Sequence, residues 1–254
     1  MAKIMKTEAF ERVAGGARSP LLLLCDHASN HLPEAYGSLG LPVSQFDRHI
    51  AYDIGARDLT LALAHRLRVP AVLSRVSRLL IDPNRGLDDP TLIMKLSDGA
   101  IVPGNARIDE AERQRRTDLY YRPYHQAVTA ALDAMVARGL APLIVSLHSF
   151  TPQWKGMARP WHVGILWDRD GRLARPMIEA FSAQDGLVVG DNEPYSGALP
   201  GDTMNVHGTG RGIAHALIEI RQDLIATKSG VDEWCERVAR VVEAIMYGVS
   251  GDDT

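Results

Sequence analysis

Residues 21–33 read LLLLCDHASNHLP, an apolar run that turns abruptly polar. The run of leucines is too short to span a membrane, but it is typical of a strand that is buried on both faces of a sheet. The polar residues that follow include Asp26, His27 and Asn30, whose side chains can bind metals or substrates. In open α/β folds, ligands bind at the carboxyl ends of the strands. The stretch therefore predicts a buried strand that leads into a functional site, and the alternative is that its histidines are ordinary loop residues.

The composition is that of an ordinary globular domain. The chain has 254 residues, 46% of them hydrophobic and 23% charged, which is enough for a sizeable core. Its net charge of -3 offers no general attraction for nucleic acid, and no apolar run reaches membrane length. Cys25 and Cys235 are too few for a disulfide framework, so we expect both to be buried thiols of a cytoplasmic protein.

Apolar strands alternate with helices along the chain. This alternation predicts a three-layer α/β/α fold, in which helices cover both faces of a doubly wound, mostly parallel mixed sheet. No boundary interrupts the pattern, so residues 1–254 are predicted to form a single domain with a loosely ordered or edge-packed lead-in at 1–18 and a disordered tail at 248–254. Strands are expected at 21–25, 71–74, 143–147, 163–167, 187–190 and 216–220, and helices at 47–67, 173–182 and 232–247. A further charged helix is expected to be capped by Asp109, to kink or restart at Pro123, and to continue until Gly139.

Two predicted strands each lead into a histidine. His27 follows the strand at 21–25, and His148 follows the strand at 143–147. If the strands are neighbours, the two imidazoles can converge on one cation. A catalytic zinc ion takes three protein ligands and keeps a fourth position open for water. The two histidines therefore predict a catalytic metal site that needs one more protein ligand.

The third ligand is open at this point. Asn30 lies three residues after His27, but a neutral amide is a poor zinc ligand. Asp47 and Asp53 are charged candidates near the start of the first predicted helix. The alternative for each aspartate is an ordinary role at a helix start, where negative charge is favourable.

Glu219 lies inside the predicted strand at 216–220, among aliphatic residues. A carboxylate buried in a strand needs a partner or a role, because burying it unpaired costs free energy. It is either the partner of an arginine in the core or a general base that activates water beside a metal.

Several residues are candidates for binding substrate. Arg75, Arg78 and Arg85 surround the short apolar run before a long polar segment at 82–107, and a planar guanidinium fits a carboxylate through two hydrogen bonds. Long loops in a compact domain are usually functional, which favours Arg85. Tyr195 lies in the second long polar segment and could donate a hydrogen bond to a tetrahedral intermediate, or simply pack.

In their order along the chain, five motifs resemble the N-formylglutamate amidohydrolase family. The resemblance spans residues 21–224, nearly the whole chain. The motifs are DHASN at 26–30, HIAYDIGA at 49–56, SRLLIDPNR at 77–85, SLHS at 146–149, and HGTGRG at 207–212 leading into IEIR at 218–221.

The same order also resembles the zinc carboxypeptidase superfamily and implies its fold. That superfamily has a glutamate where this chain has Asn30, so either Asn30 or Asp53, which lies in the second motif, would be the third metal ligand. The resemblance implies roles for five further residues: zinc binding by His27 and His148, carboxylate binding by Asn84 and Arg85, and activation of water by Glu219.

Together these features predict a metal-dependent amidohydrolase that uses zinc or another divalent ion. Its substrate would be a small acidic amino acid whose nitrogen carries an acyl group, with formyl as the expected acyl group. N-formylglutamate, for example, would be cleaved to formate and the free amino acid. Arg85 and either Arg78 or Arg75 would hold the substrate. One alternative is a related zinc peptidase or deacylase with another substrate. Another is a non-catalytic binding protein with a degraded metal site, which Asn30 motivates. The expected partner is a small molecule rather than nucleic acid or a membrane, and the oligomeric state is open.

Overall fold

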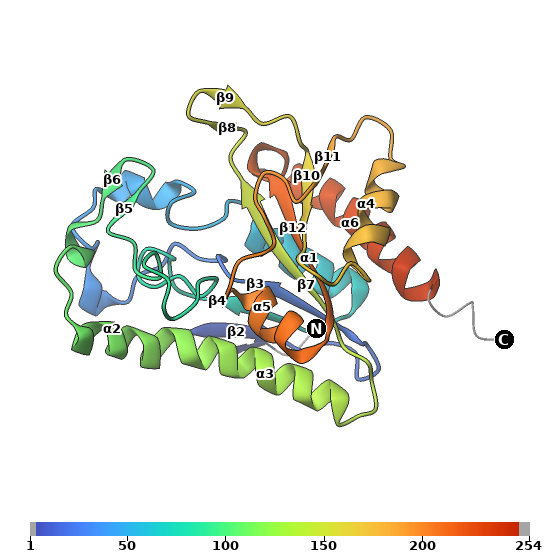
Figure 1. The fold of residues 1–254 in the computed structure, drawn as a ribbon, viewed down its shortest axis with the longest axis horizontal. Helices are drawn as coiled ribbons and strands as arrows, with labels where there is room; N and C mark the ends of the chain where they lie inside the picture. The colour runs from blue at the N-terminus through green and yellow to red at the C-terminus, as the bar shows by residue number, and fades with distance from the viewer. Residues whose placement is uncertain (1–3, 249–254) are drawn as a thin grey trace.

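The computed structural model describes residues 4–248, which form a layered α/β structure around one large sheet (Figure 1). The strands of this sheet are β1 (Ile4–Lys6), β2 (Phe10–Val13), β3 (Leu21–Cys25), β4 (Ala71–Ser74), β7 (Leu143–Phe150), β10 (Val163–Leu166), β11 (Val189–Asp191) and β12 (Ala214–Arg221). They lie in the order β1-β2-β4-β3-β7-β12-β10-β11. The central strands β4, β3, β7 and β12 are parallel to one another, whereas β10 is antiparallel to β12. The carboxyl ends of the four central strands therefore meet at one edge.

The leucines of β3 show why the sheet is buried on both faces. Leu21 and Leu23 belong to the core beneath helices α1 (Ala56–Leu67), α4 (Ala174–Ser182) and α6 (Lys228–Gly248). Leu22 and Leu24 belong to the core beneath α3 (Arg122–Val136), which crosses the opposite side of the sheet in Figure 1. Successive side chains of a strand point to opposite faces, so four consecutive leucines supply both cores. The predicted three-layer α/β/α fold with a mostly parallel mixed sheet is confirmed.

The described residues of the lead-in at 1–18 pack at the edge of the sheet, where β1 and β2 add antiparallel strands beside β4. One expectation near the amino terminus needs correction. The helix expected at 47–67 begins only at Ala56. Gly55 precedes it with a φ of 79°, and a Cβ at Gly55 would lie 2.1 Å from the backbone oxygen of Ile225. This left-handed, closely packed residue separates the helix from the turns before it.

Other differences lie in the connections. Strand β7 continues to Phe150, so His148 lies inside the strand rather than after it. Pro123 does not interrupt a helix, because α2 (Glu110–Arg116), a π-helical turn (Thr117–Tyr121) and α3 follow one another directly. The long polar segments contain elements that the sequence did not reveal: the hairpin β5 (Leu96–Ser97) and β6 (Ala100–Ile101), and the helix α5 (Thr203–His207). A further hairpin follows β7, made of β8 (Gln153–Trp154) and β9 (Met157–Ala158).

The remaining expectations concern the ends and the environment of the chain. Cys25 and Cys235 are both buried and free. The tail expected at 248–254 lies, beyond Gly248, outside the described residues. Within residues 4–248, no helix has both the length and the apolar character needed to cross a membrane.

We predict that Leu23→Ala lowers the free energy of unfolding by about 2–5 kcal/mol, because it empties a fully packed position. Leu23 is 0% exposed, whereas Val43 is 80% exposed. The control Val43→Ala should therefore change the free energy by less than about 0.5 kcal/mol. Urea denaturation measures both, and equal effects would contradict the packing described for β3.

Candidate metal centre

The carboxyl ends of the central strands gather the candidate residues in one place. His27 follows β3, while His148 of β7 and Glu219 of β12 are direct neighbours in the parallel register. Side chains at paired positions of adjacent strands point to the same face. A cavity of about 430 Å³ opens here, and all three residues line it.

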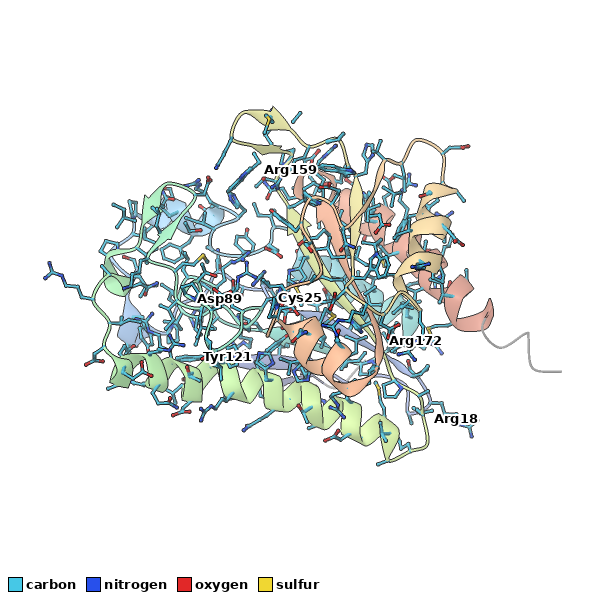
Figure 2. All side chains as sticks on the ribbon, in the orientation of Figure 1. Arg18, Cys25, Asp89, Tyr121, Arg159 and Arg172 are labelled. Carbon is cyan, nitrogen blue, oxygen red and sulfur yellow. The ribbon has the colours of Figure 1, made fainter. Side chains whose placement is uncertain are left out.

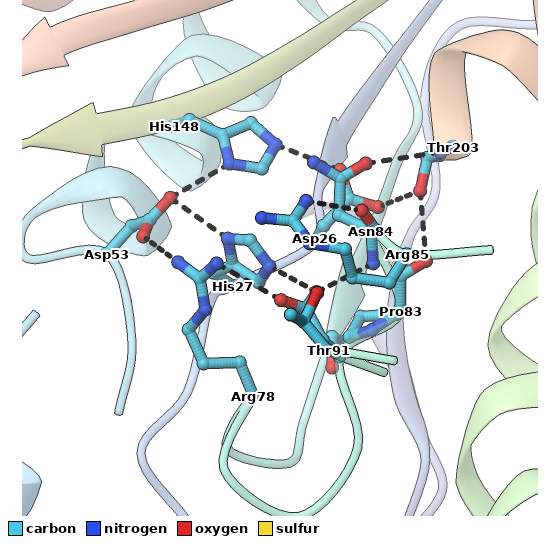
Figure 3. Close-up of polar contacts among 12 residues, drawn as sticks. Asp26, His27, Asp53, Arg78, Pro83, Asn84, Arg85, Thr91, His148 and Thr203 are labelled. Atoms are coloured by element: carbon cyan, nitrogen blue, oxygen red, sulfur yellow. Dashed lines mark hydrogen bonds and ion pairs between the residues drawn. The ribbon is translucent and has the colours of Figure 1, made fainter. Parts of the chain in front are cut away.

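Three buried side chains could hold a metal ion: His27, Asp53 and His148, whose ligand atoms all lie within 4.8 Å of one another. Oδ2 of Asp53 lies 3.3 Å from Nδ1 of His27 and 2.9 Å from Nδ1 of His148 (Figure 3). Two imidazole nitrogens and one carboxylate oxygen are a donor set typical of catalytic zinc. Both Nδ1 atoms face the carboxylate, so a cation can take the place of the protons that lie between them.

Two further carboxylates hold the far sides of the imidazole rings. Nε2 of His27 lies 2.7 Å from Oδ1 of Asp82, and Nε2 of His148 lies 3.0 Å from Oδ2 of Asp26. Metal-binding histidines commonly donate their second ring N–H to a carboxylate, which fixes the tautomer and leaves the other nitrogen free for the metal. The residues present therefore fit a divalent cation bound through both Nδ1 atoms and the carboxylate of Asp53.

The mutual contacts also decide the charges in this cluster. Burial by itself would raise the pKa of Asp53, but the neighbouring His27 and His148 outweigh it and hold the pKa of that carboxyl well below its usual range. Burial acts to lower the pKa of His148, yet its bonds to Asp26 and Asp53 raise it well above the ordinary value. In the metal-free chain His148 is thus protonated, and metal binding releases that proton.

Glu219 has a different environment from the other acids. It is 6% exposed, and its Oε2 has no hydrogen-bond partner among the described residues. Burial raises the pKa of Glu219 to about 7; the charge of Asp53 adds to this rise, and that of His148 opposes it. A buried, unpartnered carboxyl that titrates near neutral pH and faces the cavity is suited to act as a general base.

Asn30 lies outside this cluster. Its Nδ2 donates a hydrogen bond to the backbone oxygen of Phe46 at 2.8 Å, and it lines a separate cavity. Asp53 lines both cavities, and its backbone N–H donates to the backbone oxygen of His27 at 2.9 Å. Asp47 ends a 3-10 turn (Val43–Asp47) and lines neither cavity. Of the alternatives left open by the sequence, the structure places Asp53 beside the two histidines.

The arginines expected to bind substrate have different surroundings. The guanidinium of Arg78 lies 3.0 Å from Oδ2 of Asp82 and 3.4 Å from Oδ1 of Asp53, so it neutralises two acids of the metal cluster. Arg85 lines the cavity, donates to the backbone oxygen of Asn84, and has no carboxylate partner within residues 4–248. Arg75 donates to the backbone oxygen of Thr7 and does not line the cavity.

Tyr195 lines the cavity and is held by a residue that sequence reasoning missed. Nη1 of Arg159 donates to the Tyr195 hydroxyl at 3.0 Å, and its guanidinium carbon lies 5.0 Å from the centre of the tyrosine ring. Figure 2 shows Arg159 beside the β8–β9 hairpin. No periodic pattern or motif marks that segment, so the sequence carried no signal for Arg159.

Comparison with known proteins shows the family of this chain. The family model of the N-formylglutamate amidohydrolases matches residues 19–226. The chain belongs to this family. A gene product of Agrobacterium tumefaciens has a structure with 32% sequence identity and a TM-score of 0.91, covering 96% of this chain and 97% of that one. An N-formylglutamate amidohydrolase from Ralstonia eutropha is 23% identical with a TM-score of 0.70, covering 96% and 100%.

More distant matches complete the comparison. A metallo-carboxypeptidase from Burkholderia cenocepacia is 13% identical with a TM-score of 0.42, covering 94% of this chain and 61% of that one. No curated protein matches the chain. The motifs that suggested the amidohydrolase family are also those that build the site: DHASN supplies Asp26 and His27, HIAYDIGA supplies Asp53, SRLLIDPNR supplies Arg78, Asp82, Asn84 and Arg85, SLHS supplies His148, and IEIR supplies Glu219.

We predict that Glu219→Gln stabilises the metal-free protein at high pH. The folded-state pKa of Glu219 is raised from 4.5 to about 7, so the folded protein holds a proton that the unfolded chain has released. Its contribution to stability is therefore present below the unfolded pKa and is lost as pH rises through about 7.

Glutamine cannot ionise, so the Glu219→Gln variant does not lose stability in this way as pH rises. The free energy of unfolding of the variant, relative to the parent, should rise by about 2–4 kcal/mol between pH 4 and pH 8. Urea denaturation in the presence of a chelator measures it, and the titration of other groups cancels in the difference. A difference that stays constant over this range would show that Glu219 is not a buried, unpartnered acid.

Proposed function

We propose that the protein is a metal-dependent amidohydrolase that removes a small acyl group from an N-acyl amino acid. Formyl is the acyl group that we propose. The observation that carries this proposal is Glu219, whose Oε2 has no hydrogen-bond partner within residues 4–248 and which lines the same cavity as a His–Asp–His set able to hold a cation. Membership of the N-formylglutamate amidohydrolase family supports formyl as the acyl group. Zinc is the metal we propose, because two imidazoles and a carboxylate are among its usual ligand sets.

The chemistry divides between the metal site and Glu219. Bound by His27, Asp53 and His148, a divalent cation would polarise the acyl carbonyl and lower the pKa of a water molecule. The carboxylate of Glu219, whose Oε2 has no hydrogen-bond partner among the described residues, accepts the proton of the attacking water. Glu219 then returns this proton to the nitrogen of the leaving amine as the C–N bond breaks, so that formate and the free amino acid result.

Other residues of the cavity orient the substrate. Arg85 forms no ion pair within residues 4–248 and adjoins Asn84, so we assign the substrate α-carboxylate to these two. Arg78 holds the acids of the metal cluster in place. Because the Tyr195 hydroxyl accepts from Arg159, its own proton is free to donate to the oxygen of a tetrahedral intermediate. Burial raises the pKa of Tyr195, which keeps that proton in place.

The alternatives differ in what supports them. N-formylglutamate, the substrate expected from the sequence, is supported by the family name and is the reference substrate for assays. A related zinc peptidase or deacylase would use the same groups on another acyl chain, and a screen of N-formyl, N-acetyl and peptide substrates separates these activities. The non-catalytic alternative arose from Asn30, and the position of Asp53 beside the two histidines supports a metal site that does not need Asn30. A cytoplasmic location stays a prediction.

We predict that Glu219→Gln lowers the kcat of formate release by about 10²–10⁴, because it removes the general base. Zinc content and circular dichroism should match the parent, since glutamine keeps the shape of the side chain. Glu110→Gln, at an exposed position on α2, is the control and should retain activity. Near-normal turnover by zinc-loaded Glu219→Gln would rule out Glu219 as the base.

We predict that Asp53→Asn weakens zinc binding and that Asn30→Ala does not. Loss of an outer carboxylate commonly costs about 10–100-fold in metal affinity, and loss of a direct ligand costs more. Asp53→Asn should therefore weaken zinc binding more than about a hundredfold, whereas Asn30→Ala should leave it close to the parent. Competition with a chromogenic chelator measures both affinities. The reverse order would make Asn30 the third ligand.

A further inference from the structure

One wall of the active-site cavity is apolar, and we call its residues Leu166, Met204 and Leu217 the apolar wall. Leu217 lies two positions before Glu219 on β12, so both side chains point to the same face of the sheet. Leu166 of β10 pairs directly with Leu217. Met204 of α5 belongs to the same buried cluster as both leucines, and all three side chains line the cavity.

The apolar wall connects the proposed base to the proposed carboxylate site. At one end, Leu217 adjoins Glu219 along the strand. At the other end, Met204 follows Thr203, whose backbone N–H donates to Oδ1 of Asn84 at 3.1 Å. A substrate with its acyl group at Glu219 and its α-carboxylate at Asn84 spans the distance between them. Because residues of the apolar wall adjoin both of these points, the wall is available to the side chain on the α-carbon.

The charges of the cavity suit one substrate carboxylate rather than two. Arg78 is committed to Asp53 and Asp82, whereas Arg85 has no carboxylate partner within residues 4–248. An N-acyl acidic amino acid brings an α-carboxylate and a second carboxylate on its side chain. Burying the second one without a cation costs free energy. The uncommitted arginine that lines the cavity accounts for the α-carboxylate.

The polar residues next to the apolar wall also disfavour an acidic side chain. Asp202 lines the cavity, is 4% exposed, and lies two positions before Met204 at the start of α5. The charge of Arg85 acts on Asp202 as well as on the proposed α-carboxylate site, so a further carboxylate here would be unfavourable. Both ring nitrogens of His215 already have partners, the backbone oxygen of Ile213 at 2.8 Å and Oγ1 of Thr209 at 3.3 Å.

We propose that the substrate side chain packs on the apolar wall, so that the protein prefers N-formyl amino acids with apolar side chains, such as methionine and leucine, over N-formylglutamate. This inference rests on the proposed function and narrows its substrate class. Burial of an apolar side chain on Leu166, Met204 and Leu217 supplies the binding energy.

Arg159 is the cation that an acidic side chain would need to reach. Its Nη1 donates to the Tyr195 hydroxyl and to Oγ1 of Thr151. Its guanidinium carbon lies over the ring of Trp154, 5.4 Å from the ring centre. These three residues line the cavity, whereas Arg159 does not. An acidic side chain paired with Arg159 would have to lie near Tyr195, Thr151 and Trp154, so Arg159 is the position that the test changes.

The experiment compares kcat/KM for formate release by the zinc-loaded full chain. The substrates are the N-formyl derivatives of L-methionine, L-leucine, L-glutamate, L-aspartate and glycine. We expect the methionine and leucine derivatives to exceed the two acidic derivatives by about tenfold or more. A preference for N-formylglutamate that is lost in Arg159→Gln would overturn the inference and leave the proposed function standing.

Two methionine variants provide the matched comparison. Met204 and Met135 are 4% and 1% exposed and belong to the same apolar cluster, but only Met204 lines the active-site cavity. Met204→Ala should lower the ratio of kcat/KM for N-formylmethionine to that for N-formylglycine by about tenfold, and Met135→Ala should leave the ratio unchanged. An equal ratio in both variants would contradict the role of the apolar wall.

A binding measurement separates the two proposals. If the zinc-loaded parent releases no formate from any of these compounds, the proposed function fails. Calorimetric titration of zinc-loaded Glu219→Gln with N-formylmethionine and with N-formylglutamate then decides the inference on its own. Tighter binding of N-formylmethionine supports it, whereas tighter binding of N-formylglutamate, or binding of neither compound, overturns it.

Discussion

The site depends on the carboxylate of Asp53, which is shared between Nδ1 of His27 and Nδ1 of His148. A buried carboxylate is tolerated only with such partners, and here they come from the ends of two adjacent parallel strands. The backbone N–H of Asp53 is tied to the backbone oxygen of His27, and Gly55 turns the chain directly into α1. One short segment thus places a charged group where strands β3 and β7 and helix α1 meet.

Both helical layers stabilise this arrangement. Asp26, which holds Nε2 of His148, also accepts hydrogen bonds from the Tyr124 hydroxyl of α3 at 2.9 Å and from Oγ1 of Thr203 of α5 at 2.6 Å. On the other face of the sheet, Oγ of Ser149 donates a hydrogen bond to the backbone oxygen of Ile54, just before α1. The metal cluster is therefore fixed by contacts to the elements on both faces of the sheet, and its geometry is set before any ligand binds. Glu219 is the exception, since it lines the cavity and its Oε2 has no hydrogen-bond partner among the described residues.

Much of this could be predicted from sequence because the signals are local. The apolar runs gave β3 and β4 with their observed bounds, and the polar residues after or within strands marked His27, His148 and Glu219. The choice between Asn30 and Asp53 could not be made, because it depends on how the turn before α1 folds back onto β3. Asp82 and Arg159 were not assigned roles for a similar reason: their contacts join segments far apart in sequence.

The central claim is that His27, Asp53 and His148 together bind a divalent cation beside Glu219. It is tested most directly by anomalous X-ray diffraction from crystals of the zinc-loaded protein, collected on both sides of the zinc absorption edge. The account predicts one strong peak with Nδ1 of both histidines at about 2.0–2.1 Å and a carboxylate oxygen of Asp53 in its coordination shell. A peak elsewhere, or none at this cluster at full zinc loading, would contradict the account.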